Sequence, residues 1–498
     1  MKKGKSLMLL RMLTVVSALA LCTTACNDDD EQKGVPFDAS QPVVAESFAP
    51  TTGPLATQVI LRGSNFGTDV SQIHVFFNDK EAPVLGSSGD HILVLAPRLP
   101  GRYLDDGTVD NHCRITVHVA DKTVTFADFF DYQIQTNVTT LVGGDKSATN
   151  YPVGGEDLAT VQFNKEISKP IVCDSKKNIY FTMDTESDLD SNNPNVVYCI
   201  NEESGKIRVL ERGITGFLGT PYICYDQVRD RCCRFHSNMG GELYYYDREN
   251  DFSPMLWFSY SQYKNDVRTI KDAEGNDVEN PDWSPEILIE GLNALACKHM
   301  FVTRPSDGFW YGRIDQGYFV SINPNTHEMR NISGYYEPNT PNKGSGIGFA
   351  TKNGECDGMA FDPADDTKLY FTNTGSNSVW LYDFETRRLS VYAGSSSGSA
   401  GFMDGQRTQA LFDSPRQLCI DKDRNMYIAD ANNHCIRKIV MATGFVSTVA
   451  GQPRQPGYEN GTGETALFDT PVGIAVDNDG IIYVGDSRNR AIRRVAIE

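Results

Sequence analysis

A small set of charged side chains could do chemistry at one shared site of this chain. His299 and Asp357 each stand just before a short apolar run, and Lys169 and Arg416 hold the equivalent place before two others. Imidazole and carboxylate groups ligate calcium or zinc and transfer protons, whereas lysine and arginine attract anionic groups. If the apolar runs are strands that start around one axis, these side chains meet at a concave mouth, the default position of a binding site.

A second set of residues suits the recognition of sugars. Phe402 and Tyr458 lie in polar connections, and Asn432 and Arg488 lie in short turns on the same expected face. Aromatic rings stack on the apolar faces of sugars, while amides and guanidinium groups bind hydroxyls. The predicted ligand-binding residues are therefore Lys169, His299, Asp357, Arg416, Asn432, Arg488, Tyr458 and Phe402. The alternative is that these residues only form a solvated polar rim.

Four polar residues recur between two copies of a repeat and have a different interpretation. Asp430 and Asn433 return as Asp486 and Asn489. A residue that repeats in every copy is expected to serve the repeat itself, and Asp and Asn side chains commonly bond nearby backbone amides in turns. We therefore expect these four residues to cap turns, and we take residues that occur in one copy only as the better ligand candidates.

The elements that position these residues belong to a long repeat. Phe412, Pro415 and Arg437 return 56 residues later as Phe468, Pro471 and Arg493, and each copy contains apolar segments separated by polar turns. Four antiparallel strands per repeat describe the blade of a propeller. Residues 471–489 read Pro-x-Gly-Ile-Ala-Val-Asp-x-x-Gly-x-Ile-Tyr-Val-x-Asp-x-x-Asn, which closely resembles the NHL repeat family. The resemblance implies a fold and says little about function.

Weaker copies of the same pattern precede the two clear ones and predict six blades in residues 137–498. The last copy ends after its third strand. The missing fourth strand should resemble Val446–Gly451, and Val138–Gly143 does. Because an exposed sheet edge is a liability, we expect residues 138–143 to complete the final blade and close the ring. The connection 259–293 is unusually long, and such connections are either functional or disordered.

Residues 43–136 have the pattern of a small sandwich. Gln58–Gly67, Ile73–Asn78 and Cys113–Val119 alternate apolar and polar residues between turns. The sequence around Ser47–Phe66 resembles the start of an IPT/TIG domain, which implies an immunoglobulin-like fold that serves as a spacer or binding platform. The predicted fold class is therefore all-β, with an N-terminal Ig-like (IPT/TIG) β-sandwich followed by a six-bladed NHL-type β-propeller.

The first residues resemble an export signal. Residues 1–25 combine four positive charges with the apolar stretch Met12–Leu21, which is too short to span a membrane. Thr23–Cys26 resembles a bacterial lipobox, which implies lipidation of Cys26, and residues 26–42 form an acidic linker like the export signal of Bacteroidetes surface lipoproteins. We expect an outer-membrane, cell-surface protein held by its lipid. Ordinary secretion, with a solvated acidic spacer, is the alternative.

The charge of the chain excludes one class of partner. The net charge of −19 becomes −23 when residues 1–25, which hold four cations and no acids, are removed. Such a chain repels nucleic acids and anionic membrane surfaces. The cysteines follow no metal-binding spacing, and those in strand patterns, such as Cys173 and Cys419, are expected to pack in the sheets.

Two functions remain open at this point. The first is a non-catalytic binding module that captures a glycan or another nutrient for an outer-membrane uptake system, without a cofactor; a protein-interaction scaffold is hard to separate from it. The second is a lactonase-like hydrolase or lyase, in which His299 and Asp357 would help to hold calcium or zinc. We favour the first, because the sequence shows no nucleophile–base pair and too few ligands for a catalytic metal.

Overall fold

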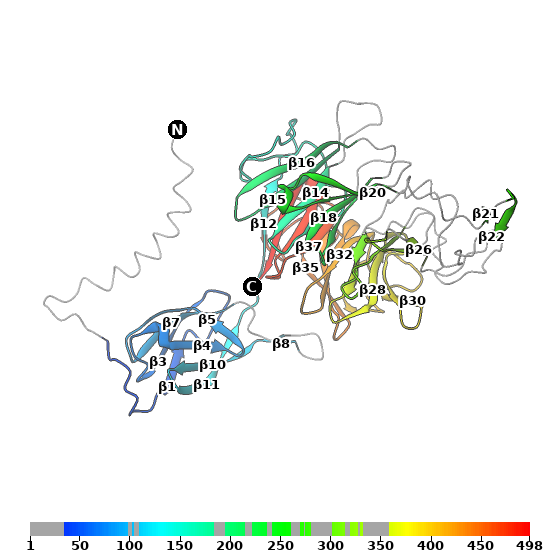
Figure 1. Ribbon diagram of the computed structural model, residues 1–498. Coiled ribbons are helices and arrows are strands. Elements are labelled where there is room, and N and C mark those ends of the chain that lie inside the picture. The colour runs from blue at the N-terminus through cyan, green and yellow to red at the C-terminus, as the bar shows by residue number, and fades with distance from the viewer. Residues whose placement is uncertain are drawn as a thin grey trace. The chain divides into compact units, whose positions relative to one another are not determined.

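The computed structural model describes the chain in several stretches. These are residues 34–97, 102–103, 109–183, 195–214, 222–236, 242–259, 269–272, 274–279, 301–313, 319–326, 329–331 and 358–498. The chain divides into two compact units, one of residues 1–100 with 112–132 and one of residues 101–111 with 133–498. In Figure 1 the strands of the first unit are blue to cyan, and the colours of the second unit run on to red at the C-terminus.

The first unit is a sandwich of two sheets. One sheet has the order β1-β3-β7-β6 and the other the order β2-β11-β10-β4-β5. The strands are β1 (Val44–Ala49), β2 (Thr52–Gly53), β3 (Gln58–Ser64), β4 (Ile73–Phe77), β5 (Lys80–Ala82), β6 (Val84–Ser87), β7 (His91–Leu95), β10 (His112–Val119) and β11 (Lys122–Tyr132).

Alternation of buried and exposed side chains along the strands builds the core of this sandwich. In β3, Val59 and Leu61 are fully buried, and the residue between them, Ile60, is 41% exposed. Phe77 of β4 meets Phe130 of β11 edge to face, with 5.2 Å between the ring centroids. Since side chains alternate between the two faces of a strand, one face of each sheet supplies the core. The predicted Ig-like sandwich is confirmed.

The second unit contains six four-stranded blades within the described residues. Their strands, in chain order, are β13 (Val172–Cys173), β14 (Asn178–Met183), β15 (Asn195–Asn201) and β16 (Lys206–Ile214); β17 (Ile223–Asp226), β18 (Arg231–His236), β19 (Glu242–Tyr246) and β20 (Pro254–Ser259); β23 (Phe301–Thr303), β24 (Trp310–Arg313), β25 (Phe319–Ile322) and β26 (Met329–Asn331); β27 (Met359–Asp362), β28 (Asp365–Asn373), β29 (Ser378–Asp383) and β30 (Arg388–Gly394); β32 (Pro415–Ile420), β33 (Asn425–Asp430), β34 (Cys435–Val440) and β35 (Phe445–Ala450); and β37 (Pro471–Val476), β38 (Ile482–Asp486), β39 (Ala491–Ile497) and β12 (Thr136–Gly143).

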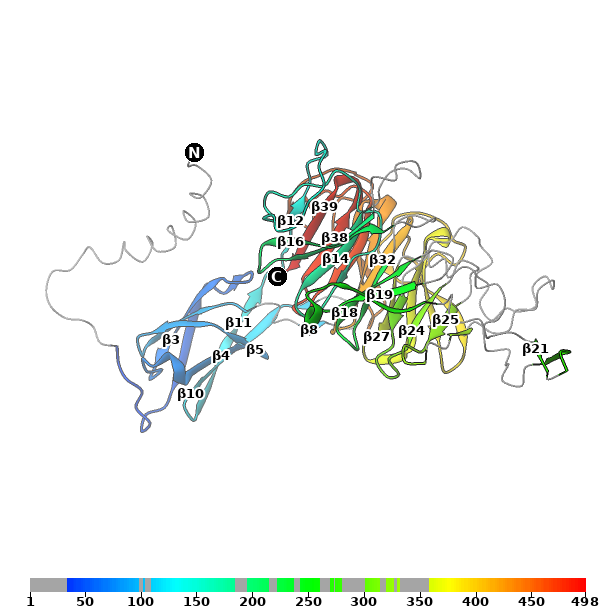
Figure 2. The same ribbon diagram turned by 45° about the horizontal axis from the view of Figure 1, so that its top comes forward.

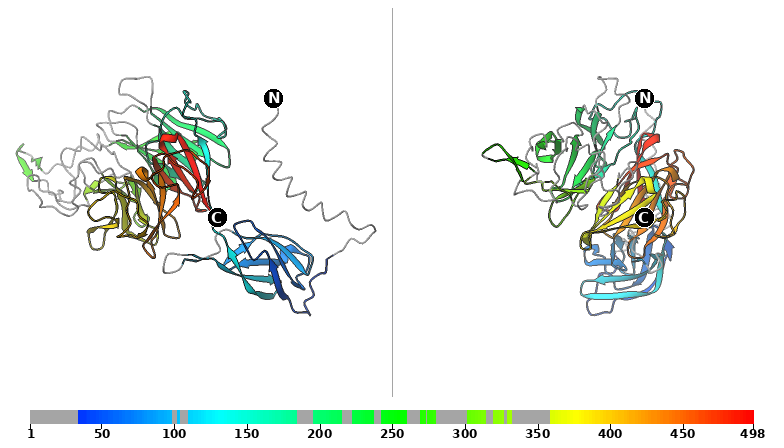
Figure 3. Two further views of the ribbon diagram at one scale, coloured as in Figure 1. Left: turned by 180° about the vertical axis from the view of Figure 1, so that it is seen from behind. Right: turned by 90° about the vertical axis from the view of Figure 1, so that its right-hand side faces the viewer.

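The blades form a closed ring around an axis. The first strand of every blade contacts the first strand of the next, in the order β13, β17, β23, β27, β32, β37, and β37 contacts β13 again. Figure 3 shows the last blade, in red, beside the orange blade that precedes it. Neighbouring blades cover both faces of the middle strands, so every residue of β33 and β38 is buried, and the strands are apolar except at Asn425, Asp430 and Asp486. The predicted six-bladed propeller is confirmed.

The last blade closes as the sequence predicts. β12 pairs antiparallel with β39, with Val138 opposite Val495 and Gly143 opposite Ala491. Figure 2 shows β12 beside β39 in this blade. Gln135 and Glu498 extend the ladder through reciprocal backbone hydrogen bonds of 2.5 and 2.7 Å. The buried side chain of Val138 packs in the same apolar cluster as Ile436 of the preceding blade.

A few short elements complete the described chain. Two extra strands, β31 (Gly405–Gln406) and β36 (Gly461–Thr462), pair along the outer strands β35 and β12. Separate hairpins are β8 (Arg102–Tyr103) with β9 (Val109–Asp110) and, within the long connection 259–293, β21 (Thr269–Lys271) with β22 (Asp277–Glu279). The 3₁₀ turns are η1 (Val70–Gln72), η2 (Arg248–Asn250), η4 (Thr374–Ser376), η5 (Ala431–Asn433) and η6 (Ser487–Asn489). In the described stretches no helix has the length and apolar character needed to cross a membrane.

Candidate functional site

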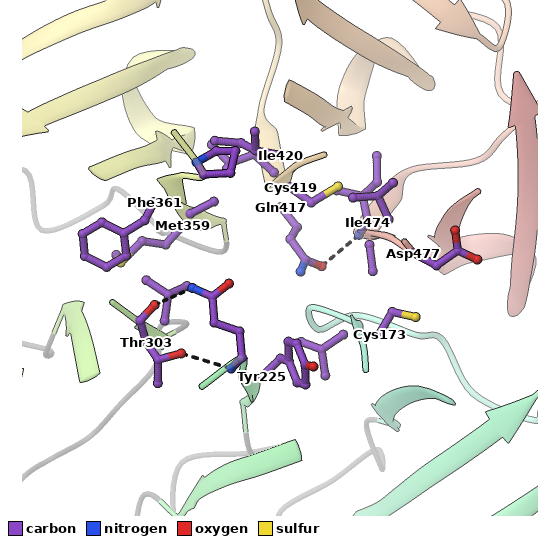
Figure 4. Close-up of a pocket in the computed structure, with 18 of the residues that line it drawn as sticks. Cys173, Tyr225, Thr303, Met359, Phe361, Gln417, Cys419, Ile420, Ile474 and Asp477 are labelled. Atoms are coloured by element: carbon purple, nitrogen blue, oxygen red, sulfur yellow. Dashed lines mark hydrogen bonds between the residues drawn. The ribbon is translucent and has the colours of Figure 1, made fainter. Parts of the chain in front are cut away.

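A cavity of about 260 Å³ lies on the axis of the propeller. The first strands of all six blades contribute to its wall, and Figure 4 shows Thr303, Met359, Gln417 and Ile474 arranged around it. Its apolar surface includes Val302, Met359 and Ile420. Polar residues in the wall are Asp174, Ser175, Tyr225, Gln227, Thr303, Asp362, Gln417, Asp477 and Asn478.

The cavity is nearer to one end of the axis than to the other. Its lining takes in the ends of the innermost strands and the turns that follow them, as at Ile420 and Asn478. The antiparallel register places Pro415 opposite Asp430, so the turn η5 lies at the start of β32. The cavity therefore opens toward the first hairpin of each blade, whereas the mouth expected from the sequence lies at the opposite end.

Gln417 forms the floor of the cavity by linking three blades. Its side-chain oxygen accepts hydrogen bonds from the backbone N–H groups of Ile171, at 2.9 Å, and Ile474, at 2.8 Å. Its side-chain nitrogen donates to the carbonyl oxygen of Ile171 at 2.7 Å. The side chain of Gln417 thus reaches from β32 to backbone beside β13 and in β37, and Figure 4 shows the bond to Ile474.

The close packing at this floor leaves no room for a second large side chain. Gly473 is the counterpart of Gln417 in the next repeat, and a Cβ atom there would lie 2.8 Å from the Cγ2 atom of Ile171. Gln417 is 2% exposed. The glutamine–glycine difference between two otherwise similar copies was visible in the sequence, and it was the signal by which this residue could have been found.

The carboxylates in the cavity wall are already engaged by other groups of the protein. Asp174 accepts a hydrogen bond of 2.9 Å from Arg248, and Asp362 accepts two from Arg424, at 3.0 and 2.7 Å. Asp477 accepts two backbone bonds of 2.9 Å within its own turn. These contacts show that the three carboxylates already stabilise the turns and the packing of the blades.

The two thiols in the wall are poor nucleophiles. Burial raises the pKa of Cys419 well above its ordinary value, with the charge of Asp421 adding to the shift. Burial likewise raises the pKa of Cys173. Because of these raised pKa values, both thiols stay protonated at neutral pH. The thiolate is the reactive form, so both sulfur atoms are poor nucleophiles there.

Buried thiols also make the folded protein less stable as the pH becomes alkaline. Burial raises the pKa of Cys232, Cys233, Cys419 and Cys435 well above 9.0. In the unfolded chain these thiols lose their protons near pH 9, whereas the folded protein keeps them, so the folded state binds more protons and loses stability as the pH rises. Each thiol then lowers the free energy of unfolding by about 1.4 kcal/mol for every pH unit above the pKa of the unfolded thiol.

We expect the melting temperature to fall steeply as the pH rises from about 8.5 to about 10.5, because the thiols of the unfolded chain lose their protons over this range. Burial lowers the pKa of Lys438 to about 8, which acts in the opposite direction, but a single lysine offsets only one thiol. Differential scanning calorimetry across this range is the measurement, with a Cys435→Ala variant as the comparison. A melting temperature that stays constant up to pH 10.5 would contradict the proton balance.

The structure describes six of the predicted ligand-binding residues, and none of them lines the cavity. Lys169 lies with its Nζ atom 4.9 Å from the centre of the Tyr222 ring. Asn432 is exposed in η5 and donates a 3.0 Å hydrogen bond to Asp413, and Arg488 is exposed in η6. Arg416 is half-buried near the start of β32. These residues belong to the opposite end of the axis and stay predictions for that mouth.

The two aromatic candidates cover buried arginines. Phe402 lies 4.7 Å from the guanidinium carbon of Arg437, and Tyr458 lies 4.9 Å from that of Arg493. The Tyr458 hydroxyl also makes a 2.8 Å hydrogen bond with Thr140 of the closing strand. Phe402 and Tyr458 occupy the same position in two copies of the repeat, and each ring packs on the equivalent buried arginine of its own blade.

The recurring aspartates pair with those arginines. Asp430 and Arg437 are both completely buried and 2.9 Å apart, and Asp486 and Arg493 repeat the pair at 2.8 Å. Neither aspartate caps the 3₁₀ turn that follows it, so the expected turn capping is wrong for the aspartates. The sequence could not show the reason, which is that each carboxylate faces a guanidinium and the backbone N–H of the preceding connection.

His299, Asp357 and Cys26 lie outside the described residues. Their predicted roles in metal binding and lipidation therefore have no structural counterpart to report. Within the described ranges, no group of three or more His, Cys, Asp or Glu side chains is placed to hold a metal ion.

The fold and its repeat define the class of protein. The pattern of the IPT/TIG domain matches residues 42–148, and that of the NHL repeat matches residues 468–494. The chain is 27% identical over 144 residues to the protein SUPPRESSOR OF QUENCHING 1 of Arabidopsis thaliana and 29% identical over 100 residues to the human NHL repeat-containing protein 2. These matches cover 28% and 20% of this chain and 14% of either relative, so the chain spans a small part of their length.

Solved structures share the architecture over most of the chain. A protein of unknown function from Bacteroides thetaiotaomicron matches 93% of this chain and 100% of its own, with a TM-score of 0.63 and 24% identity. An auxiliary nutrient binding protein from Bacteroides ovatus matches the same shares, with a TM-score of 0.54 and 20% identity. This chain therefore combines an IPT/TIG domain with an NHL-type propeller, in the fold of these Bacteroides proteins.

Proposed function

We propose that this protein is a non-catalytic binding module that holds a small polar nutrient, such as one unit of a glycan, in the axial cavity. The observation that carries the proposal is that the ionisable groups in the cavity wall are already engaged or uncharged. Its carboxylates are held by arginines and turn amides, and its thiols are protonated. A concave site with apolar walls and fixed polar groups is suited to binding.

The size of the cavity limits the ligand. At about 260 Å³ it lies just below the ~300–1,000 Å³ typical of pockets for drug-sized molecules. It therefore accommodates one small molecule or the terminal unit of a longer chain. The similar fold of an auxiliary nutrient binding protein from Bacteroides thetaiotaomicron, with a TM-score of 0.51 and 21% identity, supports the same role by analogy.

The location of the protein is part of the proposal. A lipid on Cys26 would hold the chain at the outer membrane, where it would present its ligand to an uptake system. This part rests on the N-terminal sequence, because residues 1–33 lie outside the described structure. Membrane fractionation of cells that carry a Cys26→Ala variant tests it, and a variant that stays with the membrane would contradict the anchor.

A matched pair of variants tests whether the cavity is the binding site. Asn478 is exposed at the rim of the cavity, and Asn432 is exposed in a turn at the other end of a blade. The Asn478→Trp variant should block the cavity and weaken binding at least tenfold, since an indole fills the entrance, whereas Asn432→Trp should bind normally. The measurement is a glycan screen followed by titration calorimetry on both variants. The reverse result would move the site to the mouth predicted from the sequence.

A further inference from the structure

The innermost strands of all six blades surround the axial cavity, so their backbone edges lie beside it together with the lining side chains. In the described sheets, β13, β17, β23, β27, β32 and β37 each stand at the end of the strand order, so one edge of each pairs with no other strand. These edges face the axis, where the six strands contact one another in a ring. Peptide N–H and C=O groups on such edges need hydrogen-bond partners when they are removed from bulk water.

Side-chain amides of the protein itself supply two sets of such partners. The amide of Gln417 accepts from two backbone N–H groups and donates to one carbonyl. The amide nitrogen of Gln227 donates to the carbonyl oxygen of Thr303 at 2.8 Å. A planar amide offers a donor and an acceptor side by side, which is the pattern that a strand edge presents. The inner edges therefore already bind amides.

The charge of the cavity excludes ionic ligands. Among the described residues that line it there is no lysine, arginine or histidine, and the three aspartates there are engaged by Arg248, Arg424 and turn amides. An ammonium group would have to compete with those donors, and a carboxylate would find no cation. Burying a charge without a partner costs far more than burying a hydrogen-bonded neutral group. The described lining therefore favours an uncharged ligand.

We propose that the cavity recognises an N-acetylated hexosamine through its acetamido group. The amide would bond to the strand edges as Gln417 does, and the methyl group would contact the apolar side chains of Val302, Met359 and Ile420. The sugar ring would extend toward the rim, where Ser175 and Asn478 carry polar groups. This inference rests on the proposed binding function and specifies the class of ligand for the same cavity.

Titration calorimetry with three related sugars tests the inference on the purified chain. N-Acetylglucosamine carries the neutral amide, glucose lacks it, and glucosamine carries a cation in its place. We expect N-acetylglucosamine to bind at least tenfold more tightly than either of the others, and we expect Asn478→Trp, but not Asn432→Trp, to abolish that binding. Equal or tighter binding of glucose or glucosamine would overturn the inference and leave the binding function intact.

A second experiment tests the amide preference without relying on a sugar. The Gln417→Ala variant removes the amide from the cavity floor, whereas Gln417→Leu removes the amide but fills most of its volume. Added acetamide should raise the melting temperature of Gln417→Ala by several degrees more than that of Gln417→Leu or of the unchanged protein.

The outcomes separate the two proposals. An equal shift in all three proteins, or no sugar binding at the cavity, would overturn the amide inference. Cavity binding of a ligand from another chemical class would do the same, while it would support the binding function.

Discussion

Replacing Arg437 with alanine is expected to cost about 3–5 kcal/mol of unfolding free energy, because it leaves the carboxylate of Asp430 buried without its partner. Both side chains are completely buried, at 2.9 Å from each other. The guanidinium of Arg437 also donates to the carbonyl oxygens of Leu411 and Met403 and to the carboxylate of Asp404. A single substitution therefore removes bonds to three residues of the connection between two blades, in addition to the bond to Asp430.

The charge on Asp430 explains why the loss should be large. Burial already raises the pKa of this carboxyl to about 6, against the stabilising effect of Arg437. Without the arginine, Asp430 would either take up a proton in the folded protein or stay buried as an unpaired negative charge. The double variant Arg437→Met with Asp430→Asn should recover part of the loss, since neither side chain then carries a charge.

Urea denaturation measures both effects, and Arg488→Ala provides the control. Arg488 is an exposed arginine in the following blade, and its loss should change the unfolding free energy by less than about 0.5 kcal/mol. If Arg437→Ala were no more destabilising than Arg488→Ala, the buried pair would not be a structural tie of the propeller.

The second large effect is expected at the closure of the ring. Val138 is 1% exposed and contributes to the apolar cluster between the last two blades. The Val138→Asp variant places a carboxylate in that cluster without a cation beside it, which should cost about 3–5 kcal/mol. Because β12 holds the last blade closed, the loss should lower the cooperativity of unfolding as well as its midpoint.

The adjacent residue supplies a control on the same strand. Thr139 is exposed on the opposite face of β12, so Thr139→Asp introduces the same side chain with little effect on packing. Urea denaturation followed by intrinsic fluorescence compares the two variants. Equal stability of Val138→Asp and Thr139→Asp would contradict the role of β12 in closing the ring.

The closure could be predicted because it depends on a local pattern. Val138–Gly143 resembles Val446–Gly451, and a strand of this kind fits one vacant position in the last blade. The structure places it there, opposite Ala491–Ile497. The same repeat offset also relates Phe402 to Tyr458, which we took as ligand candidates. Their common role could have been inferred from that repetition, because residues shared by two blades more often serve the blade than a ligand.

The floor of the cavity could not be predicted in this way. Gln417 bonds to Ile171, which is 246 residues away in the chain, and to Ile474, which is 57 residues away. Only the curvature of the ring brings these backbones within reach of one amide. Alignment of the blades correctly named the strands around the axis, but it placed the expected mouth where those strands start, whereas the cavity lies toward the other end of the axis.

The sequence by itself therefore determined the sandwich, the six blades and the closing strand, because alternation, repeat length and strand pairing are local or periodic properties. The tertiary structure alone decided where the cavity lies and which groups line it. A cavity depends on how side chains from all six blades fill the space around the axis, and no periodic pattern records the space that they leave.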